Sequence, residues 1–345
     1  MYRLLVRPFL FLFSPETAHH ITFSILNIWR KVPGMMHLVG KLYKVRNEKL
    51  ERTVWGIKFP SPVGLAAGLD KNATGYDVFD AIGFGFVEVG TATPKAQKGN
   101  PKPRLFRLIK DNAIINRMGF NNIGVEEIAN NLSKSYREGL IIGGNIGKNT
   151  LTPNENAADD YEKCFMALYD KVDYFVVNVS CPNIANLSKL QNTDSLGEIV
   201  EKLVRFRKTK STYKPILLKI SPDLSFEQID DSLNIINQFS LDGIVAVNTT
   251  TKRTGLSLRQ DKLDQIGNGG LSGKPLSSRS IEVVRYISMK TNGQMPIIGV
   301  GGIMSVDDAL NMLRAGAYLI QVYTGFIYHG PDLIKDIHRA IIKEF

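Results

Sequence analysis

Short apolar runs alternate along most of this chain with longer segments whose apolar residues recur at helical spacing. From about residue 46 onward there are eight such runs, each followed by a helical segment. Apolar runs bounded by polar turns are typical of the buried strands of a parallel sheet. Eight strand–helix alternations in about 300 residues favour a (β/α)8 barrel over an open sheet. The expected strands are 63–67, 86–89, 140–144, 174–179, 216–220, 243–247, 296–300 and 318–322.

The first 46 residues follow a different pattern, which predicts two helices and no strand. Apolar side chains at positions 5, 9 and 12 share one face of the first expected helix. Ser14 is suited to cap the second helix, Pro15 to begin it, and the pair Pro33-Gly34 to end it. Residues 55–59 are expected to form a short hairpin below the barrel.

The N-terminal segment also carries most of the chain's net positive charge. Of the net charge of +10, residues 1–46 carry +6, from seven basic residues and one acidic residue. A basic, apolar pair of helices suits a membrane surface, whereas a helical cap packed on the main domain is the structural alternative. A signal peptide is less well supported, because Arg7 interrupts the apolar region and no small-residue cleavage site follows.

We therefore expect two units, a membrane-associating helical hairpin at residues 1–45 and a catalytic barrel at 46–345. The sequence has no apolar run of about 18 residues, so attachment to a membrane surface is expected rather than a spanning helix. The two cysteines, Cys164 and Cys181, form no disulfide framework and suit a reducing compartment. The five histidines have no metal-ligand spacing, and no motif for reading nucleic acid is present.

Polar, amide-rich residues follow the expected strands, at the end of the barrel where TIM-barrel enzymes carry their sites. Such a rim, short of carboxylates, favours a flat, anionic, hydrogen-bonding ligand. Glycines after the seventh strand and a hydroxyl-plus-glycine turn after the eighth predict a phosphate cradle built from backbone N–H groups. In strand order the rim residues are 67–71, 90–91, 145–149, Asn178 with Cys181, Lys219, 248–250, 301–302 and 323–325.

Two side chains of this rim have more than one interpretation. Lys219 is either a Schiff-base lysine, as in aldolases, or a cation beside an electron-rich ring. Cys181 follows a buried strand and a polar turn, so it is either a thiol base or a buried cysteine at a capped strand end.

The chain closely resembles the dihydroorotate dehydrogenases, and among them the membrane-associated class that reduces quinones. The matching motifs run in order from end to end and cover essentially the whole chain. They are PETAH at 15–19, VGLAAGLDK at 63–71, GTATP at 90–94, PRLFR at 103–107, NRMGFNN at 116–122, NIGKN at 145–149, GGLSG at 269–273 and PIIGVGG at 296–302.

The resemblance implies one FMN, a dihydroorotate (orotate) site and a quinone acceptor, in the de novo synthesis of pyrimidines. It also implies a peripheral protein on the cytoplasmic face of a bacterial inner membrane, with no obligate protein partner and no nucleic acid. By motif position, the flavin would be held by Ala67, Gly68, Leu69, Asp70, Lys71, Thr91, Asn145, Asn178, Lys219, Val247, Gly273, Gly302, Tyr323 and Thr324.

The same resemblance assigns the substrate, the base and the quinone entrance. The substrate would be held by Lys71, Asn116, Arg117, Met118, Gly119, Phe120, Asn178, Asn183, Asn248 and Thr249. Cys181 would be the catalytic base, and His19 and Arg107 would face the entering quinone.

The chain departs from the quinone-reducing class at a few positions. That class usually has serine at the position of Cys181, whereas a cysteine base is typical of the soluble class. Members often carry threonine where this chain has Val247, and the loop pair Ile184-Ala185 differs from the usual Thr-Pro or Thr-Ala. A soluble-type enzyme that uses fumarate or a nicotinamide therefore stays open, as do, more remotely, a Schiff-base aldolase and a non-catalytic phosphate-binding barrel.

Overall fold

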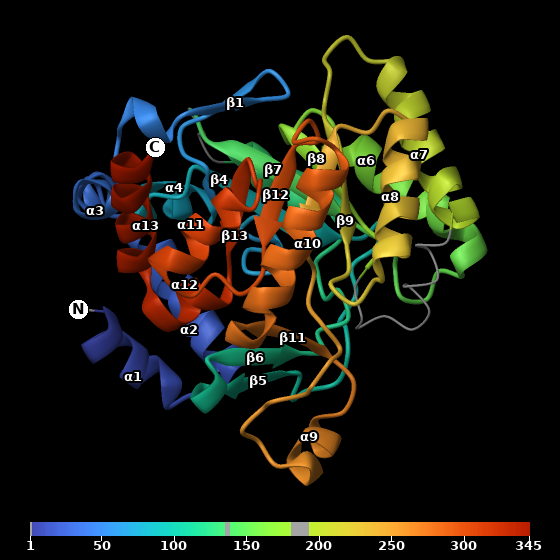
Figure 1. Ribbon diagram of the computed structural model, residues 1–345. Coiled ribbons are helices and arrows are strands. Elements are labelled where there is room, and N and C mark those ends of the chain that lie inside the picture. Colours follow the sequence, from blue (N-terminus) through green and yellow to red (C-terminus); the bar gives the residue numbers. More distant parts are fainter. Residues whose placement is uncertain (1, 135–138, 181–192) are drawn as a thin grey trace.

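Eight parallel strands close into a barrel, and helices surround it (Figure 1). The computed structural model describes residues 2–134, 139–180 and 193–345. Each of the eight expected strands is present, so the (β/α)8 prediction is confirmed. In spatial order around the barrel the strands are β10 (Gly243–Ala246), β12 (Ile297–Val300), β13 (Leu319–Val322), β3 (Val63–Leu65), β4 (Phe86–Ala92), β7 (Ile141–Ile146), β8 (Tyr174–Asn178) and β9 (Ile216–Ile220).

Alternate residues of each strand pack on opposite sides of the barrel wall. Val87 and Val89 of β4 belong to the apolar layer between barrel and helices, whereas Phe86 belongs to the cluster that fills the barrel. The filled interior leaves no room for a side chain at some positions. A Cβ added to Gly143 would lie 2.3 Å from Cζ of Tyr174, so glycine there makes space for the aromatic ring.

The outer helices are α4 (Tyr76–Ile82), α5 (Val125–Lys134), α6 (Ala157–Leu168), α7 (Thr193–Lys208), α8 (Phe226–Gln238), α10 (Ser277–Lys290), α11 (Val306–Arg314), α12 (Thr324–His329) and α13 (Pro331–Glu344). Short 3-10 turns occupy Glu48–Leu50, Ile109–Asp111, Asn154–Asn156 and Lys274–Leu276. Helix α8 begins with a capping box, in which the Ser225 side chain accepts from the backbone N–H of Gln228 and the Gln228 side chain accepts in return.

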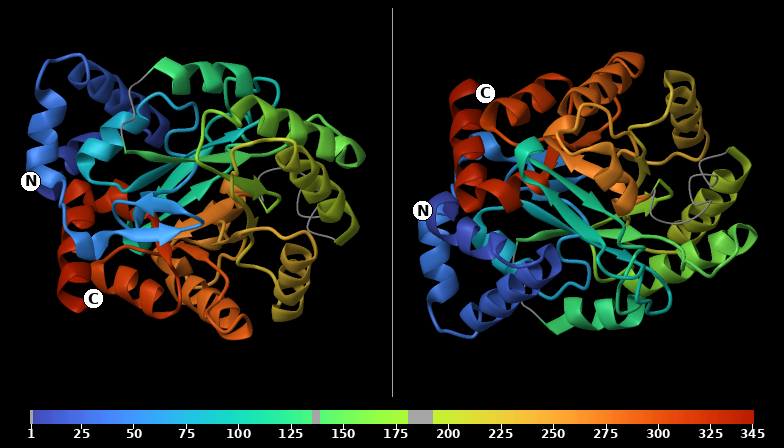
Figure 2. Two further views of the ribbon diagram at one scale, coloured as in Figure 1. Left: turned by 90° about the horizontal axis from the view of Figure 1, so that it is seen from above. Right: turned by 90° about the horizontal axis from the view of Figure 1, so that it is seen from below.

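Two small sheets lie at opposite ends of the barrel (Figure 2). The predicted hairpin is present as β1 (Arg52–Val54) and β2 (Ile57–Phe59), and Phe59 packs against Phe86 inside the barrel. At the other end lies an antiparallel sheet that the sequence did not predict. It consists of β5 (Leu105–Leu108), β6 (Ala113–Asn116) and β11 (Gly270–Gly273), and the short helix α9 (Gln260–Ile266) extends beyond it.

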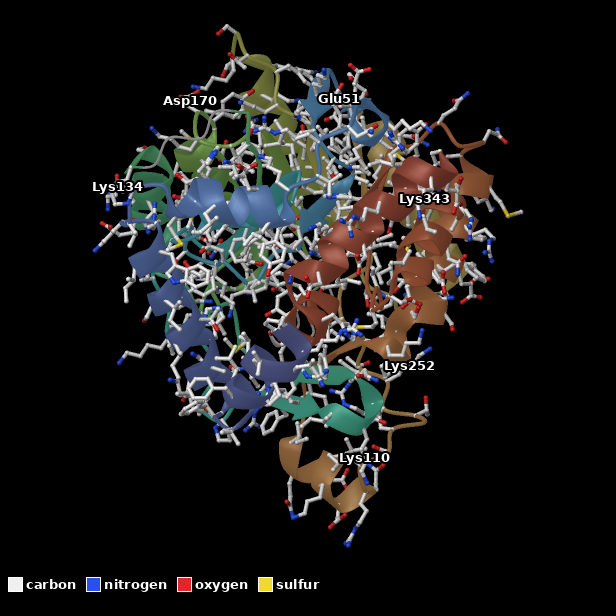
Figure 3. The ribbon with its side chains drawn as sticks, turned by 90° about the vertical axis from the view of Figure 1, so that its left-hand side faces the viewer. Glu51, Lys110, Lys134, Asp170, Lys252 and Lys343 are labelled. Atoms are coloured by element: carbon white, nitrogen blue, oxygen red, sulfur yellow. The ribbon has the colours of Figure 1, made fainter. Side chains whose placement is uncertain are left out.

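The N-terminal segment has a π-helical turn and three α-helices where two helices were predicted. A π-helical turn (Tyr2–Val6) leads into α1 (Arg7–Phe11), and α2 (Pro15–Trp29) follows, with Ser14 as its predicted N-cap. A further helix, α3 (Met35–Tyr43), begins after Gly34, which adopts a left-handed conformation. Within the described residues no helix is long and apolar enough to cross a membrane. Figure 3 shows α1 and α2, in dark blue, beside the teal strands β5 and β6.

Candidate active site

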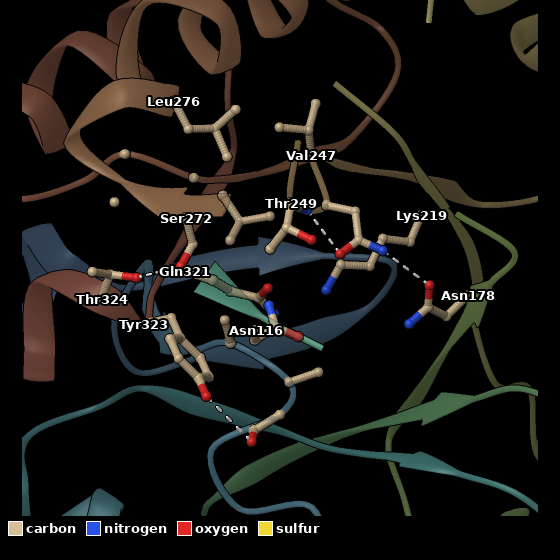
Figure 4. Close-up of a pocket in the computed structure, with 18 of the residues that line it drawn as sticks. Asn116, Asn178, Lys219, Val247, Thr249, Ser272, Leu276, Gln321, Tyr323 and Thr324 are labelled. Carbon is tan, nitrogen blue, oxygen red and sulfur yellow. Dashed lines mark hydrogen bonds between the residues drawn. The ribbon is translucent and has the colours of Figure 1, made fainter. Parts of the chain in front are cut away.

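A pocket opens at the carboxyl ends of the barrel strands, on the side where the β5–β6–β11 sheet lies. The empty space inside it, including open solvent at its mouth, is about 1030 Å³. Segments that follow the barrel strands form most of its wall, and Asn116 of β6 and Ser272 of β11 complete it. Figure 4 shows these side chains converging on the same space from different elements.

Hydrogen bonds connect the amide side chains along one wall of this pocket. Asn178 donates from Nδ2 to the Thr91 hydroxyl (3.0 Å) and to Oδ1 of Asn145 (3.2 Å). Its Oδ1 accepts from Nδ2 of Asn248 (3.2 Å), which also donates to the Ser180 hydroxyl (3.0 Å). Each amide orientation is therefore set by its neighbours, so the wall presents a fixed pattern of donors and acceptors to a ligand.

Beneath this wall, inside the barrel, lies a second polar layer that separates the pocket from the apolar interior. Oε1 of Glu88 accepts from Nδ2 of Asn145 (2.7 Å), and its Oε2 accepts from Nε2 of Gln321 (2.6 Å). Nζ of Lys219 lies 3.4 Å from the same Oε1. All four side chains are buried.

Glycines and hydroxyls make the opposite end of the pocket narrow and rich in backbone N–H groups. Gly302 has φ +74°, and a Cβ added there would lie 2.2 Å from Cα of Ser277. A Cβ on Gly273 would lie 2.3 Å from the carbonyl oxygen of Asn112. The hydroxyls of Ser272 and Thr324 are 2.8 Å apart, which fixes both at this end. Such a cradle suits a phosphate group.

A lysine and a tyrosine mark the remaining side of the pocket. Nζ of Lys71 donates to Oδ1 of Asn121 (2.7 Å), so the ammonium is directed toward the loop that follows β6. The Tyr323 hydroxyl lies 3.5 Å from the carbonyl oxygen of Gly68, and burial raises the pKa of this tyrosine to about 12. Tyr323 is thus a neutral donor at physiological pH.

Most of the residues singled out from the sequence line this pocket. They are Ala67, Gly68, Lys71, Thr91, Asn116, Met118, Gly119, Phe120, Asn178, Lys219, Val247, Asn248, Thr249, Gly273, Gly302, Tyr323 and Thr324. The structure brings these positions together from a stretch of more than 250 residues of sequence.

Four of the other expected residues lie outside the pocket wall. Asp70 is buried, and its carboxylate accepts from the backbone N–H groups of Thr74 and Gly75, so it caps the turn after β3 instead of lining the pocket. Burial raises the pKa of this carboxyl. Arg117 donates to the carbonyl oxygens of Pro103 and Ile266.

Leu69 and Asn145 are the other two expected residues that lie outside the pocket wall. Leu69 is buried in the layer between barrel and helices, and its carbonyl oxygen is 2.8 Å from Nε2 of His19. Asn145 lies behind Thr91 and Asn178 and acts on the pocket through them. Cys181 and Asn183 lie outside the described residues, as do Ile184 and Ala185.

The two residues expected near a quinone both contact the N-terminal helices and do not line the pocket. His19 of α2 stacks on Phe23 with ring centroids 4.4 Å apart. Burial lowers the pKa of His19 to about 4, so the ring is neutral at physiological pH. Arg107 of β5 donates to the carbonyl oxygens of Leu10 and Phe13, and burial lowers its pKa.

Sequence reasoning missed the buried residues Glu88 and Gln321 and the hydroxyl of Ser272. Glu88 and Gln321 lie inside expected strands that are otherwise apolar. The available signal was strand alternation, because a polar residue two positions after an inward-facing Phe86 or Leu319 must also face inward. No comparable signal existed for Ser272, whose strand belongs to the unpredicted sheet.

Fold and pocket together define a (β/α)8-barrel enzyme whose site can hold a planar, phosphate-bearing ligand. The family model described as "Dihydroorotate dehydrogenase" matches residues 49–345. A "Dihydroorotate dehydrogenase (quinone)" from Christiangramia forsetii is 51% identical over 344 residues, which are 100% of this chain and 99% of the relative. One of the same name from Thermosynechococcus vestitus is 45% identical, over 99% of this chain and 96% of the relative.

Solved structures agree with these relatives. The crystal structure of DHODH from Eimeria tenella in complex with ferulenol matches with a TM-score of 0.85 and 35% identity, over 95% of this chain and 91% of that one. The ligand-free structure from the same organism gives the same TM-score at 36% identity. The chain belongs to the dihydroorotate dehydrogenase family. Enzymes of this family are flavin-dependent oxidoreductases, so a flavin is the ligand expected in the pocket.

Proposed function

We propose that this protein binds FMN in the pocket, oxidises dihydroorotate to orotate, and passes the electrons to a membrane quinone. The observation that carries the proposal is a single pocket into which a phosphate cradle, a buried lysine and a row of hydrogen-bonded amides all face. The relatives named as quinone-dependent dihydroorotate dehydrogenases span the whole chain, including the N-terminal helices.

The cradle fits the phosphate end of FMN, because close packing of backbone segments gathers N–H groups there. At Gly273 and Gly302 a Cβ would collide with the backbone of Asn112 and Ser277, so only glycine permits this packing, and the Thr324 hydroxyl provides a side-chain donor nearby. Bound FMN would supply the two-electron acceptor that takes a hydride from the substrate and is reoxidised by the quinone.

The amide wall fits the pyrimidine ring of the substrate, and Lys71 fits its carboxylate. Both Nδ2 hydrogens of Asn178 and of Asn248 are used within the protein, so these two side chains would meet the ring through their Oδ1 atoms, as acceptors for its N–H groups. The Lys71 ammonium provides a charge-assisted contact for the substrate carboxylate. In this arrangement the residues 116–120 and 248–249 hold the substrate, and those of the phosphate cradle hold the cofactor.

We assign the removal of the substrate's C5 proton to the thiolate of Cys181. The residue before it, Ser180, is described, and its hydroxyl accepts from Nδ2 of Asn248 at the amide wall. The chain therefore enters the segment with Cys181 beside the proposed substrate residues. An unperturbed thiol has a pKa of about 8.5, so near neutral pH a far larger fraction of it is deprotonated and able to accept a proton than of a serine hydroxyl.

The N-terminal helices would take up the quinone and hold the enzyme on the cytoplasmic face of a bacterial inner membrane. Large apolar side chains are exposed on the first helical turns, with Leu4 80% and Leu12 81% exposed. The segment is also rich in basic residues, which favours an anionic lipid surface. His19 and Arg107 lie between these helices and the barrel, where a quinone entering from the membrane would pass.

Comparison of electron acceptors tests the proposal against the soluble-type alternative, which the cysteine at position 181 favours. We expect oxidation of dihydroorotate to proceed with a short-chain ubiquinone or menaquinone analogue and to be at least tenfold slower with fumarate or NAD. Turnover with fumarate or NAD that equals turnover with the quinone analogues would contradict the proposal.

A further inference from the structure

The carboxylate of Glu88 is fully buried in the barrel and does not line the pocket. Its side chain lies inside the barrel at 0% exposure, just beneath the pocket. It accepts hydrogen bonds from Asn145 of β7 and Gln321 of β13, and Lys219 of β9 supplies the nearby positive charge. Burying a carboxylate costs free energy unless it is paired and hydrogen-bonded, and these contacts offset that cost.

Two of the three partners of Glu88 also line the pocket. Lys219 and Gln321 contribute to the pocket wall, and Figure 4 shows the amino end of Lys219 directed into the pocket. Lys219 is therefore a buried ammonium with its carboxylate partner on one side and the ligand space on the other. Moving or neutralising Glu88 would change the charge that the ligand meets, although Glu88 itself does not line the pocket.

We propose that Glu88 is a positioning residue, which holds the Lys219 ammonium at the pocket wall beside the flavin and thereby helps to set the flavin's reduction potential. The inference depends on the proposed function, since it requires that the pocket holds the flavin. Reduction adds negative charge to the flavin ring, and a fixed cation beside it in a site of low dielectric stabilises the reduced form.

Loss of the carboxylate should act like loss of the lysine. A buried ammonium without a partner is costly, so without Glu88 the Lys219 side chain should withdraw from the pocket wall. The flavin then loses its cation. Glu88→Gln, which keeps the size and most hydrogen bonds of the side chain, should therefore lower the midpoint potential of bound FMN.

The experiment is a double-mutant cycle on the FMN-loaded protein. Midpoint potentials are measured by spectroscopic titration against a reference dye for the wild type, Glu88→Gln, Lys219→Met and the double variant. We expect both single variants to have lower potentials than the wild type, and the double variant to match Lys219→Met. Glu88→Gln should then have no further effect where Lys219 is absent.

Asp242→Asn is the matched control, because it also removes the carboxylate of a buried ion pair. Nη1 of Arg207 lies 2.5 Å from Oδ2 of Asp242, with side-chain exposures of 7% and 13%. Asp242 also accepts from the backbone N–H of Ile216, at the amino end of β9, and it does not line the pocket. This variant should lower the melting temperature and leave the midpoint potential unchanged.

Two results would overturn the inference while FMN stays bound. An unchanged potential in Glu88→Gln would mean that the carboxylate acts on stability alone. A higher potential would mean that Lys219 keeps its position at the pocket wall without Glu88, so that the carboxylate only opposes the positive charge of the lysine. Failure of the wild type to bind FMN would instead contradict the proposed function.

The cycle remains decisive if Glu88→Gln does not fold. Removing both members of a buried ion pair is commonly less harmful than removing one. We then expect the double variant to fold and to retain FMN as well as Lys219→Met does. A double variant that fails to fold where Lys219→Met folds would show that Glu88 supports the barrel independently of Lys219, and this would overturn the inference.

Discussion

Asn178 shows how individual side chains prepare the site before any ligand is bound. Its amide contacts Thr91, Asn145 and Asn248 at once, so its orientation is determined by three strands or strand ends. A wall fixed in this way requires little reorganisation when a planar ligand binds, which is the main advantage of a site built on a rigid barrel.

The role of Cys181 can be tested by its removal. We expect Cys181→Ala to retain FMN but to reduce it with dihydroorotate at least 100-fold more slowly, because general bases contribute about 10²–10⁴-fold. Stopped-flow absorbance under anaerobic conditions measures this step directly. In the wild type the same rate should rise with pH through one ionisation, since the thiol must be deprotonated to accept the substrate's proton.

Cys164→Ala is the matched control for this experiment. The Cys164 thiol is completely buried in α6, where it contacts the carbonyl oxygen of Ala92 at 3.6 Å. Burial raises its pKa, so this thiol is not a base at neutral pH. Flavin reduction should be close to normal in this variant. Near-normal reduction in Cys181→Ala as well would show that Cys181 is not the base.

Gly302 tests the phosphate cradle. Gly302→Ala places a Cβ 2.2 Å from Cα of Ser277, so the cradle must deform, and we expect at least a tenfold weaker affinity for FMN. Fluorescence titration of the FMN-free protein measures this affinity. Gly293→Ala is the control, because Gly293 has a similar φ of +69° but open space around it. It should cost about 1–2 kcal/mol of stability through backbone strain alone and leave FMN affinity unchanged.

At the scale of elements, the N-terminal helices are joined to the barrel by specific polar contacts and still expose apolar side chains. Glu16 of α2 pairs with Arg104 at 3.0 Å, and Arg30 pairs with Asp77 of α4 at 2.9 Å. These contacts orient the helices, while the exposed leucines and Phe9 remain free to contact another apolar phase. The element therefore has both a protein face and an outer face.

The outer face can be tested without removing the element. The triple variant Leu4→Glu, Phe9→Glu, Leu12→Glu should bind anionic liposomes at least tenfold more weakly in a sedimentation assay, because it replaces apolar contacts with like charge. Its reduction by dihydroorotate should be unchanged. Met289→Glu, at a 72% exposed position of α10, is the control and should bind liposomes as the wild type does. Equal binding by the triple variant would contradict a membrane role for this face.

A deletion of residues 1–40 removes α1, α2 and the first part of α3, and it should separate the two half-reactions. We expect reduction of FMN by dihydroorotate to persist, while turnover with quinone is lost. If quinone kinetics are unchanged in the truncated protein, the N-terminal helices have no part in quinone access.

The elements also show what the sequence could and could not reveal. The barrel strands were predictable because each is a short apolar run between polar turns, and Ser14 marked the start of α2 correctly. The β5–β6–β11 sheet could not be predicted from the sequence. Its strands are only four residues long, and β11 pairs with β6 across more than 150 residues of sequence. Helix α3 was missed because Gly34 was interpreted as the end of a helix, whereas it precedes a new one.

The candidate site was predictable to a similar degree, and for the same reason. Residues that follow barrel strands could be assigned to one rim from chain order alone, as Asn178 and Thr324 illustrate. The direction of an individual side chain could not be predicted in this way. Asp70 was expected among the cofactor residues, and the structure directs its carboxylate to the backbone of Thr74 and Gly75, outside the pocket wall. Contacts beneath the rim, such as Glu88 with Gln321, depend on how distant strands align within the closed barrel.

The whole molecule should become less stable in mild acid because of its buried histidines. Burial lowers the pKa of His19, His329 and His338 to about 4, against an ordinary value of about 6.5. Between these values the unfolded chain binds more protons than the folded one. The stabilising contribution is therefore complete above about pH 6.5 and is lost as the pH falls toward 4.

His338 is the clearest case, since it is fully buried, with Nε2 2.5 Å from the Ser61 hydroxyl. Its contribution to the free energy of unfolding should fall by about 2 kcal/mol between pH 7 and pH 5. In urea unfolding at both pH values, His338→Asn should show a smaller pH dependence than the wild type. Ser61→Ala keeps the histidine and should retain the full dependence. Equal dependence in wild type and His338→Asn would contradict this explanation.

The most direct measurement of the central claim is an anaerobic titration of the purified protein with dihydroorotate, followed by its visible spectrum. Our interpretation predicts a yellow protein with one FMN per chain, whose absorbance near 450 nm bleaches with about one equivalent of dihydroorotate and returns when a quinone analogue is added. A protein that binds no FMN when it is supplied in excess, or whose bound FMN stays oxidised in excess dihydroorotate, would contradict it.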